Sequence, residues 1–330
     1  MSKLNTKYLG LDLASPVIAG SSGLTMSIDK VKILVDSGVG AIVLKSVFEE
    51  EINKKAWTME SETGNYPEAT DYILAYTKNN SLDKYLEYIG KVRKTGVPVI
   101  ASVSCISSRE WINFTKLIES AGADALELNM FFLPLNKEQK GGKYESAYYD
   151  VANEVVSAIN IPVSVKIGPV FTNLLNVVWE LYLRKVKGVT MFNKFYEPGI
   201  NIDKPELVSG EVFSNPSDLR QVLRWVAIVS AEIPQMQISA STGVWDGTAA
   251  VKQLLAGAQT VQTVSALYRN GPAYVAEVNR FIAEWADKHG FDSVDDFRGK
   301  LNYSKIASPE LYERSQFMKY FSSGKGMYEL

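Results

Sequence analysis

MQISASTGVWDGTAAVKQLLAGAQTVQTVSALYR, residues 236–269, is the stretch of sequence that decides the fold. It contains an apolar run at Met236–Ala240, a helical pattern at Trp245–Leu255 that Asp246 begins, and a second apolar run at Thr260–Val264. Two buried parallel strands joined by a helix form the repeating unit of an α/β protein. Both strands end in small hydroxyl or glycine residues, whose backbone N–H groups can bind a phosphate. The stretch therefore indicates either a phosphate site at the two strand ends or an ordinary βαβ unit with small turn residues.

The same unit recurs through the rest of the chain. Six further short apolar runs are typical of strands buried on both faces: Pro16–Ala19, Ala41–Leu44, Pro98–Ser104, Ala125–Met130, Pro162–Ile167 and Gly188–Phe192. Helical patterns follow the eight strands, beginning near Ser27, Ser81, Arg109, Lys143, Asn173, Ser217, Asp246 and Pro272. Eight β-α units without an internal linker predict an α/β fold, a single (β/α)8 TIM barrel. Two dinucleotide-binding domains are the alternative, but no strand is followed by G-x-G-x-x-G.

Four segments lie outside this repeat. Tyr8–Leu13 predicts a small N-terminal hairpin that caps the barrel, and residues 1–301 form one predicted barrel domain. Residues 302–330 predict a C-terminal helical tail that packs on the barrel or on a partner subunit. Two long stretches, Val47–Asn80 and Asn193–Asn215, have no regular pattern. The first contains aromatic residues, and loops of this length are usually functional or disordered, so we expect it to be a packed lid.

Composition excludes several classes of function. The 330 residues carry a net charge of −2 without a basic stripe, so we expect no nucleic-acid partner. No apolar run approaches the length of a membrane span, and a single cysteine allows no intrachain disulfide, which favours the cytoplasm. His289 is the only histidine, which excludes a multi-histidine metal site, and we expect no metal. Proton transfer must use other side chains, or a cofactor must carry the chemistry.

Polar residues end the otherwise apolar strands. In such barrels these ends meet at one rim, where the chemistry takes place. Two lysines and two asparagines there, Lys45, Lys166, Asn129 and Asn193, are costly to bury without a partner. The set suits a flat, polar heterocycle on which lysine stabilises negative charge. Reduced flavin is such a ligand, and its phosphate would occupy the site at Thr242-Gly243 and Val264-Ser265.

The order of short motifs resembles a known family. SSGLT follows the first strand, LKS ends the second, ELN ends the fourth, and VKIGP, FNK, STG and SAL follow the fifth to the eighth. In this order and spacing they resemble the class 1 dihydroorotate dehydrogenases, FMN-dependent (β/α)8 barrels of pyrimidine synthesis. The resemblance runs from about Leu9 to Leu301 and includes the late segment HGFDSVDDFRGKL.

The resemblance implies roles for individual residues. It implies FMN contacts from twelve positions: Ser21, Ser22, Gly23, Lys45, Ser46, Asn129, Lys166, Asn193, Thr242, Gly243, Val264 and Ser265. Lys166 would lie near the flavin N1/O2 edge and stabilise the anionic reduced form by its charge. Lys45 and Lys166 are the implied catalytic residues, and Asn129 and Asn193 the implied substrate contacts. Lys194 replaces a serine of the family pattern, and it either binds an anionic substrate or is solvated. The resemblance also implies a homodimer.

The sequence departs from the family pattern after the fourth strand. The family has Asn-Leu-Ser-Cys-Pro-Asn, in which the cysteine removes a substrate proton, whereas residues 129–134 here read NMFFLP. Phe132 stands at the cysteine position and has no titratable group, and Pro134 replaces an asparagine that binds the substrate. Cys105, at the end of the third strand, is either a replacement base or a small buried residue. Tyr66 and Tyr72 in the expected lid are either further candidates for the base or packing groups of the lid.

Three hypotheses of function remain open at this point. The first is an FMN-dependent oxidoreductase acting on a CH–CH bond of a small anionic substrate, dihydroorotate by resemblance, with an FMN enzyme of another substrate as its variant. The second is a non-redox phosphate-binding barrel, a lyase or isomerase that uses Lys45 or Lys166 as base or Schiff-base amine. The third is a barrel that has lost catalysis and serves as a binding subunit.

Overall fold

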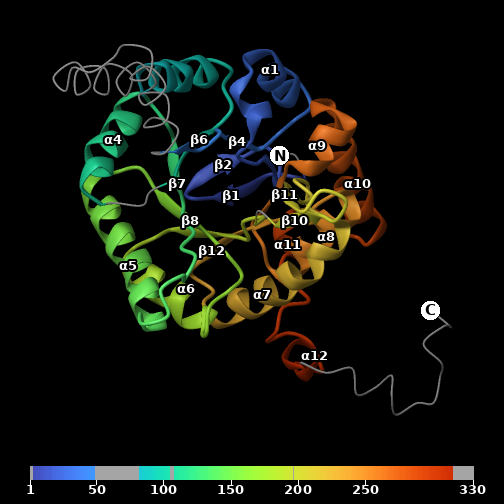
Figure 1. Ribbon diagram of the computed structural model, residues 1–330. Helices are drawn as coiled ribbons and strands as arrows, with labels where there is room; N and C mark the ends of the chain where they lie inside the picture. Colours follow the sequence, from blue (N-terminus) through green and yellow to red (C-terminus); the bar gives the residue numbers. More distant parts are fainter. Residues whose placement is uncertain (1–2, 49–81, 105–107, 196, 315–330) are drawn as a thin grey trace.

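Eight parallel strands form a closed barrel at the centre of the protein (Figure 1). The computed structural model describes residues 3–48, 82–104, 108–195 and 197–314. The barrel strands are β3 (Val17–Ala19), β4 (Ala41–Val43), β6 (Val99–Ser104), β7 (Ala125–Asn129), β8 (Val163–Ile167), β9 (Gly188–Met191), β12 (Gln237–Ser241) and β13 (Thr260–Thr263). Pairing of β3 with β13 and of β4 with β6 closes the ring. The predicted single (β/α)8 barrel is confirmed.

Helices cover the outside of the barrel, as Figure 1 shows. They are α1 (Ile28–Asp36), a helix at residues 82–93, α4 (Ser108–Ser120), α5 (Gly141–Ala158), α6 (Leu174–Leu183), α7 (Leu219–Glu232), α8 (Gly247–Ala256), α9 (Ser265–Asn270) and α10 (Val275–Lys288). Asp246 caps α8 by accepting from the Ala249 backbone N–H, as its position in the sequence predicts. His289 ends α10 at the surface, away from the barrel rim. In the described part of the chain, no helix combines the length and apolar character needed to cross a membrane.

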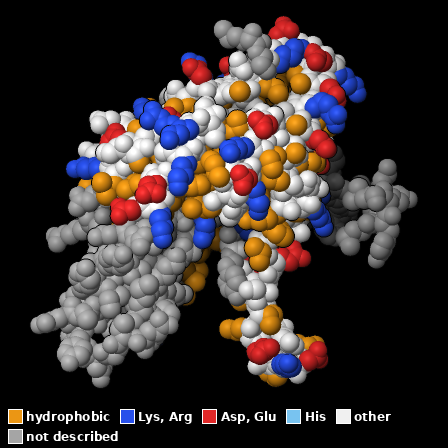
Figure 2. All heavy atoms as spheres, turned by 90° about the horizontal axis from the view of Figure 1, so that it is seen from above, with side chains coloured by type: hydrophobic (Ala, Val, Ile, Leu, Met, Phe, Trp, Pro, Cys, Tyr) orange, Lys and Arg blue, Asp and Glu red, His pale blue; other side chains and the backbone are white. Residues whose placement is uncertain are grey.

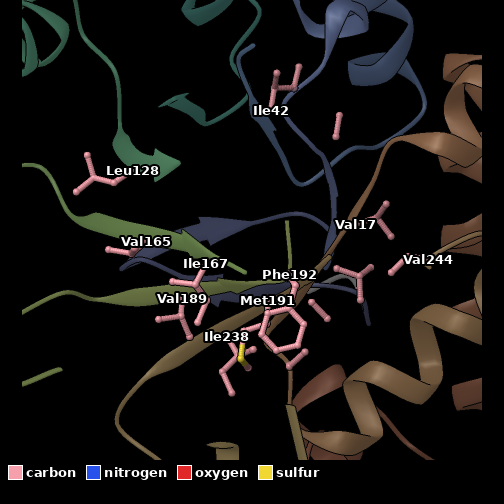
Figure 3. Close-up of a cluster of buried hydrophobic side chains, with 14 of the residues drawn as sticks. Val17, Ile42, Leu128, Val165, Ile167, Val189, Met191, Phe192, Ile238 and Val244 are labelled. Carbon is pink, nitrogen blue, oxygen red and sulfur yellow. The ribbon is translucent and has the colours of Figure 1, made fainter. Parts of the chain in front are cut away.

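The main hydrophobic core lies between the strands and the helices. Figure 3 shows side chains from adjacent strands in this layer, among them Val165 of β8, Val189 of β9 and Ile238 of β12. All three are fully buried, together with Val177 of α6. Burying an aliphatic side chain of this size stabilises the fold by about 1.5–3 kcal/mol. This layer holds the strand ends, and so the polar rim, in fixed positions.

A two-stranded hairpin closes the amino-terminal end of the barrel. The strands β1 (Thr6–Tyr8) and β2 (Leu11–Leu13) pair antiparallel and lie across the barrel in Figure 1, so the predicted hairpin cap is present. Tyr8 and Leu13 form a second buried cluster with Ile18 and Ile100, which come from the barrel strands. The hairpin therefore fills the barrel from below and leaves the opposite rim as the open end.

The buried hydroxyl of Tyr8 leads us to expect different effects of two substitutions on stability. It is buried, the side chains of Thr190, Ser164 and Ser239 lie near it, and none of them meets it with full hydrogen-bond geometry in the described chain. Burial, with a smaller contribution from the charge of Glu127, raises the pKa of Tyr8. We expect Tyr8→Phe to leave the free energy of unfolding unchanged or to increase it, since it removes a buried hydroxyl that makes no well-formed hydrogen bond. Tyr8→Ala should lower it by about 3–5 kcal/mol through the cavity it creates. Urea unfolding of the three proteins measures both effects, and a Tyr8→Phe protein less stable than wild type by more than about 1 kcal/mol would contradict the first.

The long stretch after the sixth barrel strand is not entirely irregular. It contains an antiparallel hairpin, β10 (Pro198–Asn201) and β11 (Glu206–Ser209), so the prediction of a structureless loop was wrong there. Ile200, Ile202 and Leu207 of this hairpin are 71%, 87% and 77% exposed. Polar and apolar side chains are both exposed here, so the sequence lacks the apolar–polar alternation by which a strand is detected.

The homodimer that the resemblance implies stays a prediction.

Other predictions concern the ends and the remaining loops. Strand β5 (Val47–Phe48), which pairs with the end of β6, begins the first long stretch; the rest of the expected lid lies outside the described residues. Beyond the barrel, α11 (Val294–Phe297) packs on α8, and α12 (Glu310–Glu313) packs on α7. The Tyr303 N–H donates to the carbonyl of Ala227, which joins the chain after residue 301 to the barrel.

Figure 2 shows acidic and basic side chains interspersed over the face it presents, without a continuous field of one sign.

Candidate active site

A cavity of about 470 Å³ opens at the carboxyl ends of the barrel strands. Cavities that hold small ligands usually measure about 300–1,000 Å³. The lining includes nine of the predicted cofactor residues, Ser21, Ser22, Gly23, Lys166, Asn193, Thr242, Gly243, Val264 and Ser265, together with Lys194. The barrel thus brings to one place strand ends that are far apart in the sequence.

The three other predicted cofactor residues lie beside this lining. Asn129 accepts a hydrogen bond from the Asn193 side chain at 2.7 Å, and its own Nδ2 is 3.5 Å from the Ser46 hydroxyl. Ser46 in turn contacts the Ser21 hydroxyl at 3.2 Å. Lys45, at the end of β4, is half-buried next to Ser46. Hydrogen bonds therefore connect the ends of β3, β4, β7 and β9 into one polar rim.

Lys166 places a buried positive charge at the cavity. It is the fourth residue of β8 and only 8% exposed. Among the described residues, no carboxylate and no hydrogen-bond acceptor pairs with its ammonium group. A buried ammonium without a partner is costly, so this position favours a ligand with negative charge or strong acceptors.

The turn after β12 contains two consecutive residues with positive φ angles. Thr242 and Gly243 have φ angles of 79° and 80°, the left-handed region that a β-branched residue rarely adopts. The Thr242 hydroxyl donates to the Phe192 carbonyl at 2.8 Å, which holds the turn against the end of β9. In the described chain, the backbone N–H groups of Gly243 and Ser265 make no hydrogen bond. These two donors are available to a phosphate.

One wall of the cavity was missed by sequence reasoning. Val212, Phe213 and Ser214 line it, from the stretch between β11 and α7. The Ser214 N–H donates to the Ser265 hydroxyl at 3.0 Å, and the Trp245 indole N–H donates to the Ser214 carbonyl at 2.9 Å. This segment is therefore held beside the predicted phosphate site. In the sequence, only the length of the stretch between β9 and α7 pointed to this segment. Its hydrogen-bond partners, Trp245 and Ser265, come later in the chain, after β12 and β13.

Aromatic residues occupy the rim near the ends of β7 and β8. Phe131 packs on Phe195 with ring centroids 4.3 Å apart, above Gly168. Phe132 turns the other way and meets Tyr148 of α5 edge-on at 4.9 Å. Burial raises the pKa of Tyr148 to about 12, so this hydroxyl stays protonated at neutral pH. Phe132 therefore packs on the helical layer, and Phe131 is the aromatic neighbour of the rim.

The comparison with known proteins agrees with this arrangement. The family model described as dihydroorotate dehydrogenase matches residues 3–285. The chain belongs to the dihydroorotate dehydrogenase family. The chain is 24% identical over 316 residues to the catalytic subunit of dihydroorotate dehydrogenase B (NAD(+)) from Thermoplasma volcanium, covering 91% of this chain and 98% of the relative. It is 27% identical over 323 residues to dihydroorotate dehydrogenase A (fumarate) from Lactococcus lactis subsp. cremoris, with 90% and 99% covered. It is 24% identical over 327 residues to dihydroorotate dehydrogenase (fumarate) from Lachancea kluyveri, with 91% and 99% covered.

The described part of the cavity contains no carboxylate, imidazole or thiol that could act as a general base. The described residues that line the cavity include no aspartate, glutamate, histidine or cysteine. Cys105, Tyr66 and Tyr72, the candidates from the sequence, lie outside the described residues. Lys194 lines the cavity, but its ammonium pairs with Glu197 at 3.0 Å. An anionic substrate would therefore compete with Glu197 for this lysine.

Proposed function

We propose that this protein is an FMN-dependent oxidoreductase that takes two electrons from a CH–CH bond of a small anionic substrate. The observation that carries the proposal is Lys166, a buried ammonium at the cavity without a partner in the described chain. A flavin ring gains negative charge on reduction, and a fixed cation beside it stabilises that charge. Membership of the dihydroorotate dehydrogenase family supports the same chemistry.

The residues present fit this cofactor. Gly23 lines the cavity without a side chain, and a Cβ atom there would lie 2.9 Å from the Tyr268 hydroxyl. The backbone donors at Gly243 and Ser265 suit a phosphate, and Asn193 and Lys166, which lie at the ends of the neighbouring strands β9 and β8, offer donors to a polar ring. An elongated ligand with a phosphate at one end and a polar ring at the other uses all of these groups.

Each group then has a task. When bound, FMN would accept the hydride equivalent that leaves the substrate. Lys166 would hold positive charge beside the ring, and Gly243 and Ser265 would fix the phosphate through their N–H groups. The side chains of Asn129 and Asn193 are hydrogen-bonded to each other at 2.7 Å. They would orient the substrate by the amide donors and acceptors that this hydrogen bond does not use. Phe131 and Phe195 would exclude water from that side of the site.

Dihydroorotate is the substrate to test first, because relatives over nearly the whole chain are named for it. Lys194 would bind the substrate carboxylate, with release of Glu197. The base that removes the substrate proton would come from the rim outside the described residues, where Cys105 is the candidate.

A visible absorption spectrum of the purified protein tests the proposal. We expect flavin bands in the protein as isolated or after addition of FMN, and we expect anaerobic dihydroorotate to bleach them. Bands that persist with dihydroorotate would overturn this substrate and keep the cofactor. A protein that binds no FMN would overturn the whole proposal and favour the non-redox barrel, for which borohydride would trap a carbonyl substrate on Lys45 or Lys166.

A further inference from the structure

A polar cluster lies inside the barrel, one layer below the rim. Its centre is Glu127 of β7, a carboxylate that is 1% exposed. One of its oxygens, Oε2, accepts hydrogen bonds from the Thr190 hydroxyl of β9 and from the Gln262 amide of β13, both at 2.8 Å. Buried charged groups in the interior of such a barrel, where aliphatic residues usually fill the layers, call for a specific explanation.

These contacts fix the orientation of the Gln262 amide. Its nitrogen donates to Glu127 and approaches the Thr190 hydroxyl at 3.3 Å. A carboxylate can only accept hydrogen bonds, and in the amide of Gln262 only the nitrogen can donate one. The nitrogen must therefore face Glu127, and the carbonyl oxygen must face away. That oxygen is buried and has no partner in the described chain.

Gln262 also belongs to the cavity. It is one of the residues that line it, although it is 2% exposed. A Cβ atom on Gly20, which follows β3 at the rim, would lie 3.2 Å from the Gln262 carbonyl oxygen. The oxygen is therefore on the rim side of the amide, and the absence of a side chain at Gly20 leaves room for it.

We propose that Gln262 is a cofactor-binding residue whose carbonyl oxygen accepts a hydrogen bond from a ring N–H, and that Glu127 is the positioning residue that sets its orientation. This inference rests on the proposed function and names a contact that the sequence motifs do not include. The oxidised flavin ring has a single N–H donor, the imide between its two carbonyl groups. An oriented acceptor at the floor of the cavity is the complement of that donor, and the donor would satisfy an otherwise orphaned buried oxygen.

Titration of the cofactor-free protein with FMN, followed by flavin fluorescence, tests the contact. We expect Gln262→Met to raise the dissociation constant roughly three- to tenfold, the effect of one hydrogen bond. The matched control is Gln253→Met: Gln253 is also fully buried with an unpartnered carbonyl oxygen, but it lies on α8 and does not line the cavity. This control should bind FMN as the wild type does.

The role of Glu127 is tested by a double-mutant cycle. Glu127→Gln keeps the shape but lets either amide face the other, so it should weaken FMN binding and shift the visible absorption bands of the bound flavin. In the Glu127→Gln/Gln262→Met protein the effect should equal that of Gln262→Met alone, because Glu127 acts through Gln262. FMN methylated at the imide nitrogen should bind more weakly than FMN to the wild type, and Gln262→Met should reduce this discrimination.

The possible failures are distinguishable. Wild-type protein that binds FMN while Gln262→Met binds it equally well would overturn this inference and leave the proposed function intact. Additive effects in the cycle would overturn the positioning role of Glu127. A wild type that does not bind FMN would overturn both. Should Gln262→Met fail to fold, Thr190→Val removes one of the two groups that hold the amide, and unchanged FMN affinity and bands in that variant would count against the inference.

Discussion

Lys166→Ala should lower the midpoint potential of the bound flavin by about 60 to 90 mV. Removing one donor that stabilises developing negative charge costs about 2.7–4 kcal/mol in a pre-organised site. For a two-electron couple, about 1.4 kcal/mol corresponds to 30 mV. Lys166 is buried at the cavity and has no partner in the described chain, so its whole charge is available to the ligand. Without it the reduced cofactor is less stable, and the potential falls.

Dye-coupled reduction of the wild type and the variant under anaerobic conditions measures this shift. Lys187→Ala is the control, because Lys187 is exposed and precedes β9 at the opposite end of the barrel. The rate of flavin reduction by substrate should fall by about 10²–10³-fold in Lys166→Ala and remain unchanged in the control. Equal potentials in the wild type and Lys166→Ala would show that the charge of Lys166 does not act on the flavin.

Gly243→Ala should abolish tight FMN binding and destabilise the fold. A Cβ atom at this position would lie 2.4 Å from the backbone nitrogen of Leu219, and backbone atoms cannot move aside as a flexible side chain can. The φ angle of 80° adds about 1–2 kcal/mol for any residue with a Cβ atom, and the overlap adds about 1–3 kcal/mol. The turn must shift to relieve the overlap, and its N–H group then no longer faces the phosphate.

Gly96→Ala separates these two contributions. Gly96 has a φ angle of 79°, but a Cβ atom there would meet nothing within 4 Å. The control should therefore lose only the conformational part of the stability and keep its affinity for FMN. Thermal unfolding without ligand and FMN titration of both variants are the measurements. A Gly243→Ala protein with the stability and affinity of the control would rule out the close approach to Leu219.

Most of the barrel could be predicted from the sequence because its strands are buried on both faces. Runs such as Val163–Ile167 are then almost continuously apolar, and the helices between them begin at recognisable caps such as Asp246. The hairpin β10–β11 gives no such signal, since residues 206–209 are all exposed and neither face is apolar. Its formation depends on pairing across a turn, which hydrophobic periodicity does not report.

The site was predictable only where it consists of strand ends. The barrel fixes where those ends lie, so Lys166 and Gly243 could be assigned to one rim from their places in the chain. Phe213 and Ser214 could not, because hydrogen bonds to Trp245 and Ser265 bring their segment to the cavity. Phe132 shows the opposite failure: an aligned position suggested a place in the site, but packing on Tyr148 turns the side chain away.

The pairing of β3 with β13 has a consequence for the synthesis of this protein. Val17 lies next to Val261 in the ring, so the first barrel strand forms one edge of an open sheet until the last strand has left the ribosome. At about 5–20 residues per second, that interval is roughly 10 to 50 s. During this interval, Ile18 and the apolar residues of the β1–β2 hairpin lie in a barrel that is not yet closed. The unpaired strand edges then favour association with other nascent chains. A messenger truncated before codon 260 would yield a chain that lacks β13 and cannot close the ring, and we expect that product to aggregate.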